Sequence, residues 1–186
     1  FLIDPVIPGK HVNLRFHATI MAGQGEPVVE VMMDTLTQKP REYLLLVEGS
    51  VQTGENGRYC AIGELEGKHL TMKDTVAKLA KDALAVISVG TCASFGGIPT
   101  AVPNPTQATS VMAFLKEASI SKPVINAPGC PPHPDWITGT IASVLLKGLP
   151  SPDELDPALR PKAFYGKLIH DNCPRRAYFD AGRFAR

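Results

Sequence analysis

The chain has 186 residues, of which 44% are apolar and 20% are charged, and its formal net charge is +1. This length and composition suit a globular protein with one sizeable core. The small net charge gives no electrostatic case for binding nucleic acid or an anionic membrane surface. No apolar run approaches the roughly 18–20 residues of a membrane-spanning helix. We therefore predict no nucleic-acid partner.

The first part of the chain mixes strand and helix patterns. Apolar and polar residues alternate over 11–16, which predicts a half-buried strand. Apolar residues at helical spacing predict a helix over 27–36. The apolar run 43–47 ends at Glu48 and is typical of a buried parallel strand that leads into a loop. The glycine-containing segment 54–57 predicts a turn.

From residue 71 onwards, helical and strand patterns alternate. An amphipathic helix is predicted over 71–84, followed by a buried strand over 83–89. Residues 111–115 belong to another helical pattern, and 122–126 form a third apolar strand. A further helix begins at Pro134, which is tolerated in a first turn, and runs to about Lys147. Strands that alternate with helices predict an α/β fold with a parallel sheet.

The composition changes after the last of these helices. Two proline-rich stretches follow Leu149, and they are typical of a linker. We therefore predict a first domain over 1–149, a linker over 150–162, and the beginning of a second region over 163–186.

Two of the four cysteines lie in Gly/Pro turns that directly follow predicted strands. These are Cys92 and Cys130. Because open α/β sheets carry functional groups at the carboxyl ends of their strands, both thiols are expected at one edge. Such a pair favours ligands for an inorganic centre, and glycine-rich turns offer backbone amides to the sulfurs of an iron–sulfur cluster. The alternative is two small buried apolar side chains.

Other candidate residues are less specific. His170 and Cys173 are spaced so that both can reach one metal ion, but a turn with an incidental thiol has the same pattern. Cys60 has no partner at a ligand spacing and is predicted to be a buried structural residue. Glu48 either accepts hydrogen bonds from loop amides or lies at the functional edge. His133 follows two prolines and is predicted to be a turn residue.

Several motifs occur in a fixed order over essentially the whole chain. They are Glu48-Gly49-Ser50, Gly90-Thr91-Cys92-Ala93-Ser94-Phe95-Gly96-Gly97, Pro103-Asn104-Pro105-Thr106, Pro128-Gly129-Cys130-Pro131-Pro132, Phe164-Tyr165-Gly166, Ile169-His170-Asp171-Asn172-Cys173 and Arg175-Arg176-Ala177-Tyr178-Phe179-Asp180-Ala181-Gly182. The series closely resembles the small, electron-transferring subunit of nickel–iron hydrogenases. The resemblance implies a flavodoxin-like open parallel sheet with helices on both faces, followed by the start of a cluster-binding C-terminal region.

The resemblance also implies roles for individual residues. Cys92 and Cys130 match two of the four thiolates of the proximal 4Fe–4S cluster. His170 and Cys173 match two of the four ligands of the distal 4Fe–4S cluster. Cys60 matches no cluster ligand. None of these residues makes or breaks bonds in a substrate, so the chain is expected to have no catalytic residue.

Two neighbours of the proximal ligands, Glu48 and Thr91, are candidates for contacts with the surroundings of that cluster. Gly97 stands where oxygen-tolerant members carry an extra cysteine, so the resemblance is to the standard type. The family has a Cys-x-x-Cys followed closely by Glu and an apolar pair, and this chain begins with Phe1-Leu2. We therefore expect an internal segment, with the other distal ligands and a third cluster, such as 3Fe–4S, beyond Arg186.

The implied function is a relay of electrons from hydrogen oxidised at a nickel–iron site in a large partner subunit. The electrons would pass through the clusters to a downstream carrier, either a cytochrome or a quinone-linked one. The resemblance implies a periplasmic location and leaves open membrane association through a partner. Two alternatives remain: the related iron–sulfur subunit of complex I or of energy-converting hydrogenases, and a cluster-free or flavin-binding α/β module.

Overall fold

A three-stranded parallel sheet forms the centre of the computed structural model, which describes residues 8–184. The strands are β1 (Leu44–Glu48), β5 (Ala85–Val89) and β7 (Val124–Ala127), in the order β1-β5-β7. Glu48 lies opposite Val89, and Val89 lies opposite Ala127. The carboxyl ends of the three strands therefore meet at one edge, and the prediction of a parallel α/β sheet is confirmed.

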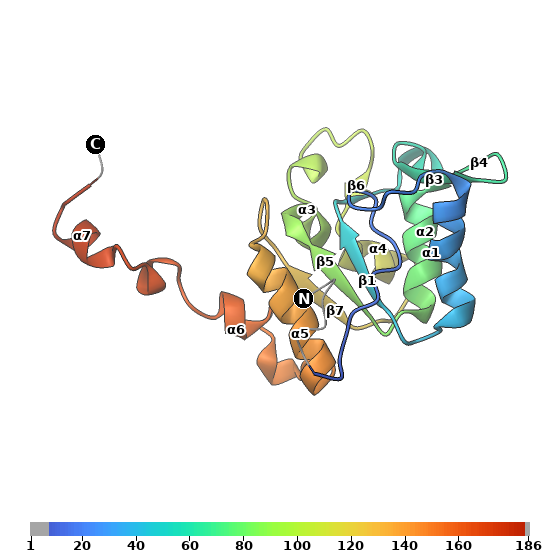
Figure 1. The fold of residues 1–186 in the computed structure, drawn as a ribbon. Coiled ribbons are helices and arrows are strands. Elements are labelled where there is room, and N and C mark those ends of the chain that lie inside the picture. Colours follow the sequence, from blue (N-terminus) through green and yellow to red (C-terminus); the bar gives the residue numbers. More distant parts are fainter. Residues whose placement is uncertain (1–7, 185–186) are drawn as a thin grey trace.

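Four longer helices surround this sheet (Figure 1). They are α1 (Glu26–Gln38), α2 (Met72–Asp82), α4 (Val111–Glu117) and α5 (Pro134–Lys147). Side chains cap three of them. The hydroxyl of Thr71 accepts from the amide of Asp74, and Ser110 caps α4 in the same way. His133 Nδ1 accepts from the first turn of α5. These caps fix where the helices begin, and the four predicted helices are confirmed.

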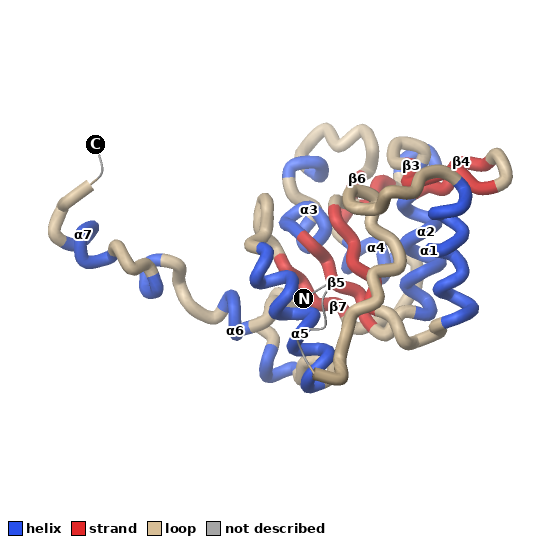
Figure 2. Tube along the Cα trace, viewed as in Figure 1, coloured by secondary structure: helices blue, strands red, loops and turns tan. Residues whose placement is uncertain are grey.

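The helices cover both faces of the sheet (Figure 2). Each face is apolar, because neighbouring residues of a strand such as β5 point to opposite sides. Val86 packs with Val76 of α2 and Phe114 of α4. Ile87 belongs to a second cluster with Ile141 of α5. Both β5 side chains are fully buried. The core is therefore two apolar layers, one on each side of the strands, as the resemblance implies.

One predicted strand is wrong. Residues 11–16 form no strand in the structure, because no neighbouring segment hydrogen-bonds to them as a partner strand. Val12 instead packs beside the α5 cluster, and Phe16 packs beside Val29 of α1. The alternating pattern therefore reflects two separate surface contacts along an extended segment.

Two small antiparallel pairs were not predicted. One consists of β2 (Val51–Gln52) and β6 (Ala108–Thr109), and the other of β3 (Ala61–Leu65) and β4 (Lys68–Thr71). These strands are short and mostly carry mixed polar and apolar residues, so the apolar pattern alone does not reveal them. The predicted turn over 54–57 is the 3₁₀ helix η1 (Gly54–Gly57).

The remaining elements are short helices. They are α3 (Gly90–Phe95), η2 (Ile98–Thr100), η3 (Pro152–Glu154), α6 (Lys162–Tyr165), η4 (His170–Asn172) and α7 (Arg176–Asp180). After α6 the chain leaves the body as an extended C-terminal arm, residues 166–184 (Figure 1). The domain boundaries at 149 and 162 remain a prediction. No helix within residues 8–184 has the length and apolar character needed to cross a membrane.

Candidate metal centre at the sheet edge

The carboxyl edge of the sheet collects four of the residues singled out by the sequence. Glu48 ends β1 and is exposed. Thr91 and Cys92 lie in α3, which begins directly after β5. Cys130 follows the end of β7 by three residues. The Cys92 segment is thus a short helix where a tight turn was predicted, but its place at the end of a strand is as expected.

Two hydrogen bonds join the two cysteine segments directly. The amide of Thr91 donates to the carbonyl of Gly129 at 2.9 Å, and the amide of Gly129 donates to Thr91 Oγ1 at 3.1 Å. Each partner is the residue immediately before a cysteine. Thr91 therefore sets the position of the Cys92 segment relative to the Cys130 segment, which gives it a structural role at this edge.

Glycine leaves the space that this arrangement needs. Gly97 has φ of +61°, and a Cβ built there would lie 2.8 Å from Cys92 Sγ. Gly129 has φ of +147°, and a Cβ there would overlap the backbone of Pro132. The sulfur of Cys92 therefore occupies room that any other residue at position 97 would take away.

The thiols are available as ligands. Cys92 is partly buried, Cys130 is exposed, and neither is in a disulfide. Within the part of the chain that the structure describes, no group of three or more His, Cys, Asp or Glu side chains is placed to hold a metal ion. Two free thiols on hydrogen-bonded, glycine-containing segments have the donor chemistry of an iron–sulfur site. This edge therefore fits half of a four-thiolate ligand set.

Three apolar side chains that follow Cys92 in the sequence are exposed, and we call them the apolar patch. Phe95 is 46% exposed, Ile98 is 86% exposed and Val102 is 97% exposed. Large side chains this exposed, within eight residues of one another and close in sequence to a candidate ligand, are typical of a surface that another protein covers.

Tyr165 is a residue of this site that sequence reasoning missed. Its hydroxyl donates to the carbonyl of Pro128 at 2.9 Å, two residues before Cys130. Its ring packs edge-on against Trp136 of α5 at 4.8 Å. Burial raises the pKa of Tyr165 to about 12, although the guanidinium of Arg160 opposes the increase. No sequence pattern identifies this contact, because 37 residues separate the two partners.

The segment before α6 covers the outer edge of β7. The backbone amide of Asn126 donates to the carbonyl of Leu159 at 2.9 Å, and its side-chain amide donates to Ala158 at 2.8 Å. Asp156 holds this segment in shape through an ion pair with Arg160 at 2.6 Å. The strand that leads to Cys130 is therefore supported from both sides.

The other two candidate ligands lie together on the C-terminal arm. The amide of Cys173 donates to the carbonyl of His170 at 3.3 Å, and the ring of His170 packs edge-on against Phe179 at 4.7 Å. Both side chains face one hollow, the arm hollow, which is lined by His170, Cys173, Arg175, Arg176, Tyr178, Phe179, Arg183 and Phe184. The structure brings this pair together and keeps it on the arm, away from the sheet edge (Figure 1).

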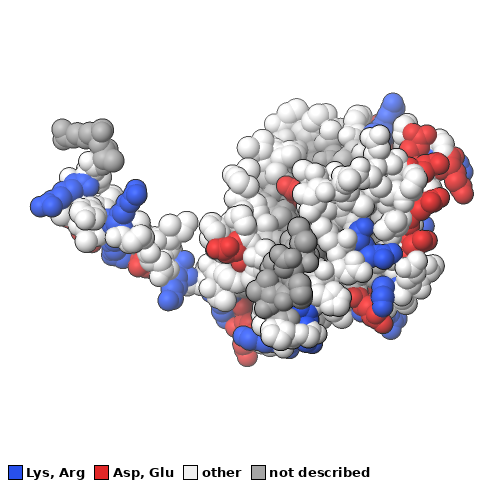
Figure 3. All heavy atoms as spheres, in the orientation of Figure 1, with Lys and Arg blue, Asp and Glu red and all other residues white. Residues whose placement is uncertain are grey.

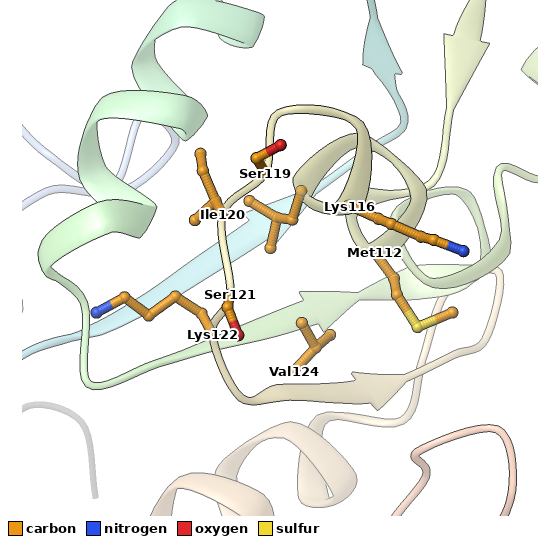
Figure 4. A pocket seen from close by; sticks show the side chains of 8 residues that line it. Met112, Lys116, Ser119, Ile120, Ser121, Lys122 and Val124 are labelled. Atoms are coloured by element: carbon orange, nitrogen blue, oxygen red, sulfur yellow. The ribbon is translucent and has the colours of Figure 1, made fainter.

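A second hollow carries none of the candidate residues. It lies between α4 and the start of β7 and is lined by Met112, Leu115, Lys116, Ser119, Ile120, Ser121, Lys122 and Val124 (Figure 4). The ammonium of Lys122 donates a hydrogen bond to the carbonyl of Ala83 at 2.9 Å. Cys60 is elsewhere, partly buried against the core with its sulfur 3.9 Å from that of Met72. Burial raises the pKa of the Cys60 thiol, as suits a structural residue.

Comparisons with known proteins extend over most of the chain. The family model described as NADH ubiquinone oxidoreductase, 20 Kd subunit, matches residues 3–144. The periplasmic [NiFeSe] hydrogenase small subunit of Desulfomicrobium baculatum is 41% identical over 94% of this chain and 58% of that subunit. The F420 non-reducing hydrogenase I small subunit of Methanosarcina mazei is 39% identical over 94% of this chain and 51% of its own length.

Solved structures show the same similarity. The reduced, active Ni-Fe-Se hydrogenase from Desulfomicrobium baculatum superposes with a TM-score of 0.82 at 41% identity, covering 95% of this chain and 66% of the matched one. The chain thus spans between half and three fifths of the length of these two small subunits. The resemblance to hydrogenase small subunits is confirmed by these relatives.

Proposed function

Because the chain belongs to the family of the NADH ubiquinone oxidoreductase 20 Kd subunit, and because its relatives are hydrogenase small subunits, we propose that it is part of the electron-transfer subunit of a nickel–iron hydrogenase. In this function it relays electrons from hydrogen, oxidised on a large partner subunit, towards a carrier. The chain itself contributes ligands and a scaffold and has no catalytic residue.

One observation favours this function over a complex I type subunit. The family model ends at residue 144, whereas the match to hydrogenase small subunits covers 94% of the chain. Only two residues precede the family model. The match to hydrogenase small subunits therefore continues for about thirty residues past residue 144. The part of the chain past residue 144 includes His170 and Cys173, which an electron relay would use as cluster ligands.

At the sheet edge, we assign Cys92 and Cys130 as two of the four thiolates of a proximal 4Fe–4S cluster. The hydrogen bonds between Thr91 and Gly129 hold the two ligand segments together. Gly97 leaves room for the Cys92 sulfur, and Glu48 lies at the same edge. A cluster bound there supplies a one-electron carrier, whose potential depends on burial and on hydrogen bonds to its sulfurs.

On the arm, we assign His170 and Cys173 as two of the four ligands of a distal 4Fe–4S cluster. The imidazole and the thiol line the same hollow, and the edge-on contact with Phe179 holds the imidazole ring. The remaining ligands of both clusters, and a third cluster such as 3Fe–4S, belong to other parts of the proposed subunit.

The proposed partners follow from the surface. The exposed patch of Phe95, Ile98 and Val102 is suited to a large subunit that covers the Cys92 edge. A downstream carrier, cytochrome or quinone-linked in the implied function, takes the electrons. The D. baculatum relative is named periplasmic, and we propose the same location here; any membrane association would come through a partner.

The test uses the assembled complex of the full small subunit with its large subunit. Cys92→Ser and Cys130→Ser are each compared with Cys60→Ser as the matched control. Hydrogen-dependent viologen reduction, iron content and the EPR spectrum of the reduced complex are measured. Each ligand variant is expected to lose or convert one cluster, about four irons per site in the wild type. It is also expected to reduce viologen more slowly than the wild type, because the relay is interrupted.

The control variant is expected to keep its iron and its activity, since Cys60 is not a ligand in this assignment. A Cys92→Ser complex with the full iron content and an unchanged EPR spectrum contradicts the proximal assignment. A wild-type complex that reduces quinone from a nicotinamide donor, without any hydrogen uptake, favours the complex I alternative. A subunit without iron favours the cluster-free module.

A further inference from the structure

We propose that Ser88 and Asn126 hold one buried water molecule between β5 and β7, and that this water link keeps the strand register that aligns the two cysteine segments. The inference rests on the proposed function in one respect, because the register then serves to place two cluster ligands. It goes further by assigning a water site and two positioning residues behind the candidate metal centre.

Two side chains in the sheet each carry a polar atom that has no partner. Ser88 and Asn126 are both fully buried, with an exposed fraction of 0%. Within residues 8–184, neither Ser88 Oγ nor Asn126 Oδ1 makes a hydrogen bond. A buried polar atom without a partner lowers the stability of the fold, so native proteins supply one, which can be an ordered water molecule.

The two residues lie opposite each other on neighbouring strands. Ser88 of β5 is the register partner of Asn126 of β7, so both side chains point to the same face of the sheet. The side-chain nitrogen of Asn126 donates to the carbonyl of Ala158 at 2.8 Å. This bond fixes which end of the amide is the oxygen, because the opposite orientation would set Oδ1 against another oxygen. Oδ1 therefore needs a donor on the face that it shares with Ser88.

A water molecule matches both atoms at once, since it accepts from the hydroxyl of Ser88 and donates to Oδ1 of Asn126. A third buried hydroxyl is close by, because Ser94 Oγ donates to the carbonyl of Ser88 at 3.3 Å. Such a polar neighbourhood is what a buried water requires. A charged side chain does not fit, because the buried polar side chains among the described residues are all uncharged. Figure 3 shows the lysine, arginine, aspartate and glutamate side chains at the surface.

The register matters because it continues into the candidate site. Ser88 lies four residues before Cys92, and Asn126 lies four residues before Cys130. The same pairing extends to the hydrogen-bonded residues directly before the two cysteines. The apolar residues of these strands do not fix the register by themselves, since a slip of two residues leaves every side chain on its face. That slip would move one cysteine segment by roughly 6–7 Å and would part the two polar atoms from their shared water.

The experiment uses the assembled complex of the full small subunit with its large subunit. Ser88→Ala is made in the wild type and in the Asn126→Leu background. Thr75→Val is the control, because it also removes a buried hydroxyl, one that bonds within its own helix region to the carbonyl of Thr71. The release of iron to a chelator is followed over time, and EPR spectra show which cluster is lost.

Ser88→Ala is expected to release iron from the proximal cluster about fivefold faster than the wild type, because the water loses one of its partners. The distal cluster should be lost at the wild-type rate, which a general loss of stability would not produce. In the Asn126→Leu background, Ser88→Ala should no longer accelerate the release, because the link is already broken. Thr75→Val should stay within about twofold of the wild type. An equal effect of Ser88→Ala in both backgrounds, or parallel loss of both clusters, overturns the proposal.

A crystal structure of the wild-type complex gives an independent decision. An ordered water within hydrogen-bond distance of Ser88 Oγ and Asn126 Oδ1 supports the link, whereas a direct bond between the two atoms, or no water there, contradicts it. A wild-type complex without iron contradicts the proposed function, and the crystal structure then still decides whether the water site exists.

Discussion

At the scale of single residues, the candidate site depends on more than its ligands: it needs a position without a side chain and a contact from a distant residue. The sulfur of Cys92 lies where a side chain at position 97 would stand. The carbonyl of Pro128 is held by a tyrosine far along the chain. Neither feature changes the chemistry of the thiols, but each restricts where a thiol is placed.

Gly97→Ala is expected to displace the Cys92 sulfur. The new Cβ would lie 2.8 Å from Sγ, and φ at this position is +61°. Gly67→Ala is the matched control, because its φ is +70° and nothing lies within 4 Å of the added Cβ. The control should cost about 1 kcal/mol of unfolding free energy from backbone strain alone. Gly97→Ala should cost more, and only this variant should change the alkylation rate of Cys92. Equal effects of the two variants on both measurements contradict the contact.

Stability at high pH should depend on Tyr43 and Tyr165. Burial raises the pKa of each to about 12, from 10.0. The folded state therefore holds these protons between pH 10 and 12 while the unfolded state releases them, so stability is full below pH 10 and falls as the pH rises towards 12. Urea unfolding across this range should show a shallower loss for Tyr43→Phe and Tyr165→Phe. Tyr59→Phe, with an exposed ring, should follow the wild type.

At the scale of elements, the loop between α5 and α6 supports the strand that carries Cys130. Burial by itself raises the pKa of Asp156, but the hydrogen bonds from Arg160 and Ala158 outweigh it, and the pKa lies below its usual range. The carboxylate accepts from the amides of Ala158 and Arg160 at 2.9 Å each. This one side chain therefore shapes the whole loop.

Asp156→Asn is expected to lower the unfolding free energy by about 1–3 kcal/mol, because a charge-assisted set of hydrogen bonds is lost. Asp153→Asn, an exposed neighbour, is the control and should change it little. Since the folded pKa of Asp156 is lowered, its contribution is present above the usual carboxyl pKa and disappears as the pH falls through the folded value. The Asn variant should therefore lose less stability in acid. A wild type and variant with parallel pH profiles would exclude this role.

At the scale of the whole molecule, the body and the arm have different surfaces. The body presents apolar side chains beside Cys92, whereas the arm presents arginines and aromatic rings around His170 and Cys173. An electron relay needs one surface to receive electrons and another to release them. In the proposed function, the large subunit covers the first surface, and the second surface holds part of the distal cluster site.

Ile98→Asp combined with Val102→Asp is expected to weaken assembly with the large subunit at least about tenfold, because buried apolar area contributes roughly 25 cal/mol per Å². Ile20→Asp is the control, since that side chain is also exposed, at 59%, but lies far from the cysteine segments in sequence. Co-purification of the two subunits at a series of concentrations measures the effect. Assembly of the double variant at wild-type affinity rules out this patch as the contact.

The sequence by itself determined the parallel α/β fold, the four long helices and the place of Cys92 and Cys130 after two strands. It did so because buried parallel strands read as continuous apolar runs and amphipathic helices repeat every 3.6 residues. The prediction failed for residues 11–16, because an alternating pattern does not form a strand when no neighbouring strand pairs with it. The roles of the four ligands remain predictions that the fold accommodates.

Only the tertiary structure decided which distant residues meet. Thr91 and Gly129 are 38 residues apart, and Tyr165 and Pro128 are 37 apart, yet each pair is hydrogen-bonded. No local pattern encodes such contacts, because they arise when β5 and β7 align and α5 brings the following loop back over the sheet. The fit of Gly97 against a sulfur is likewise a matter of space, which sequence periodicity does not describe.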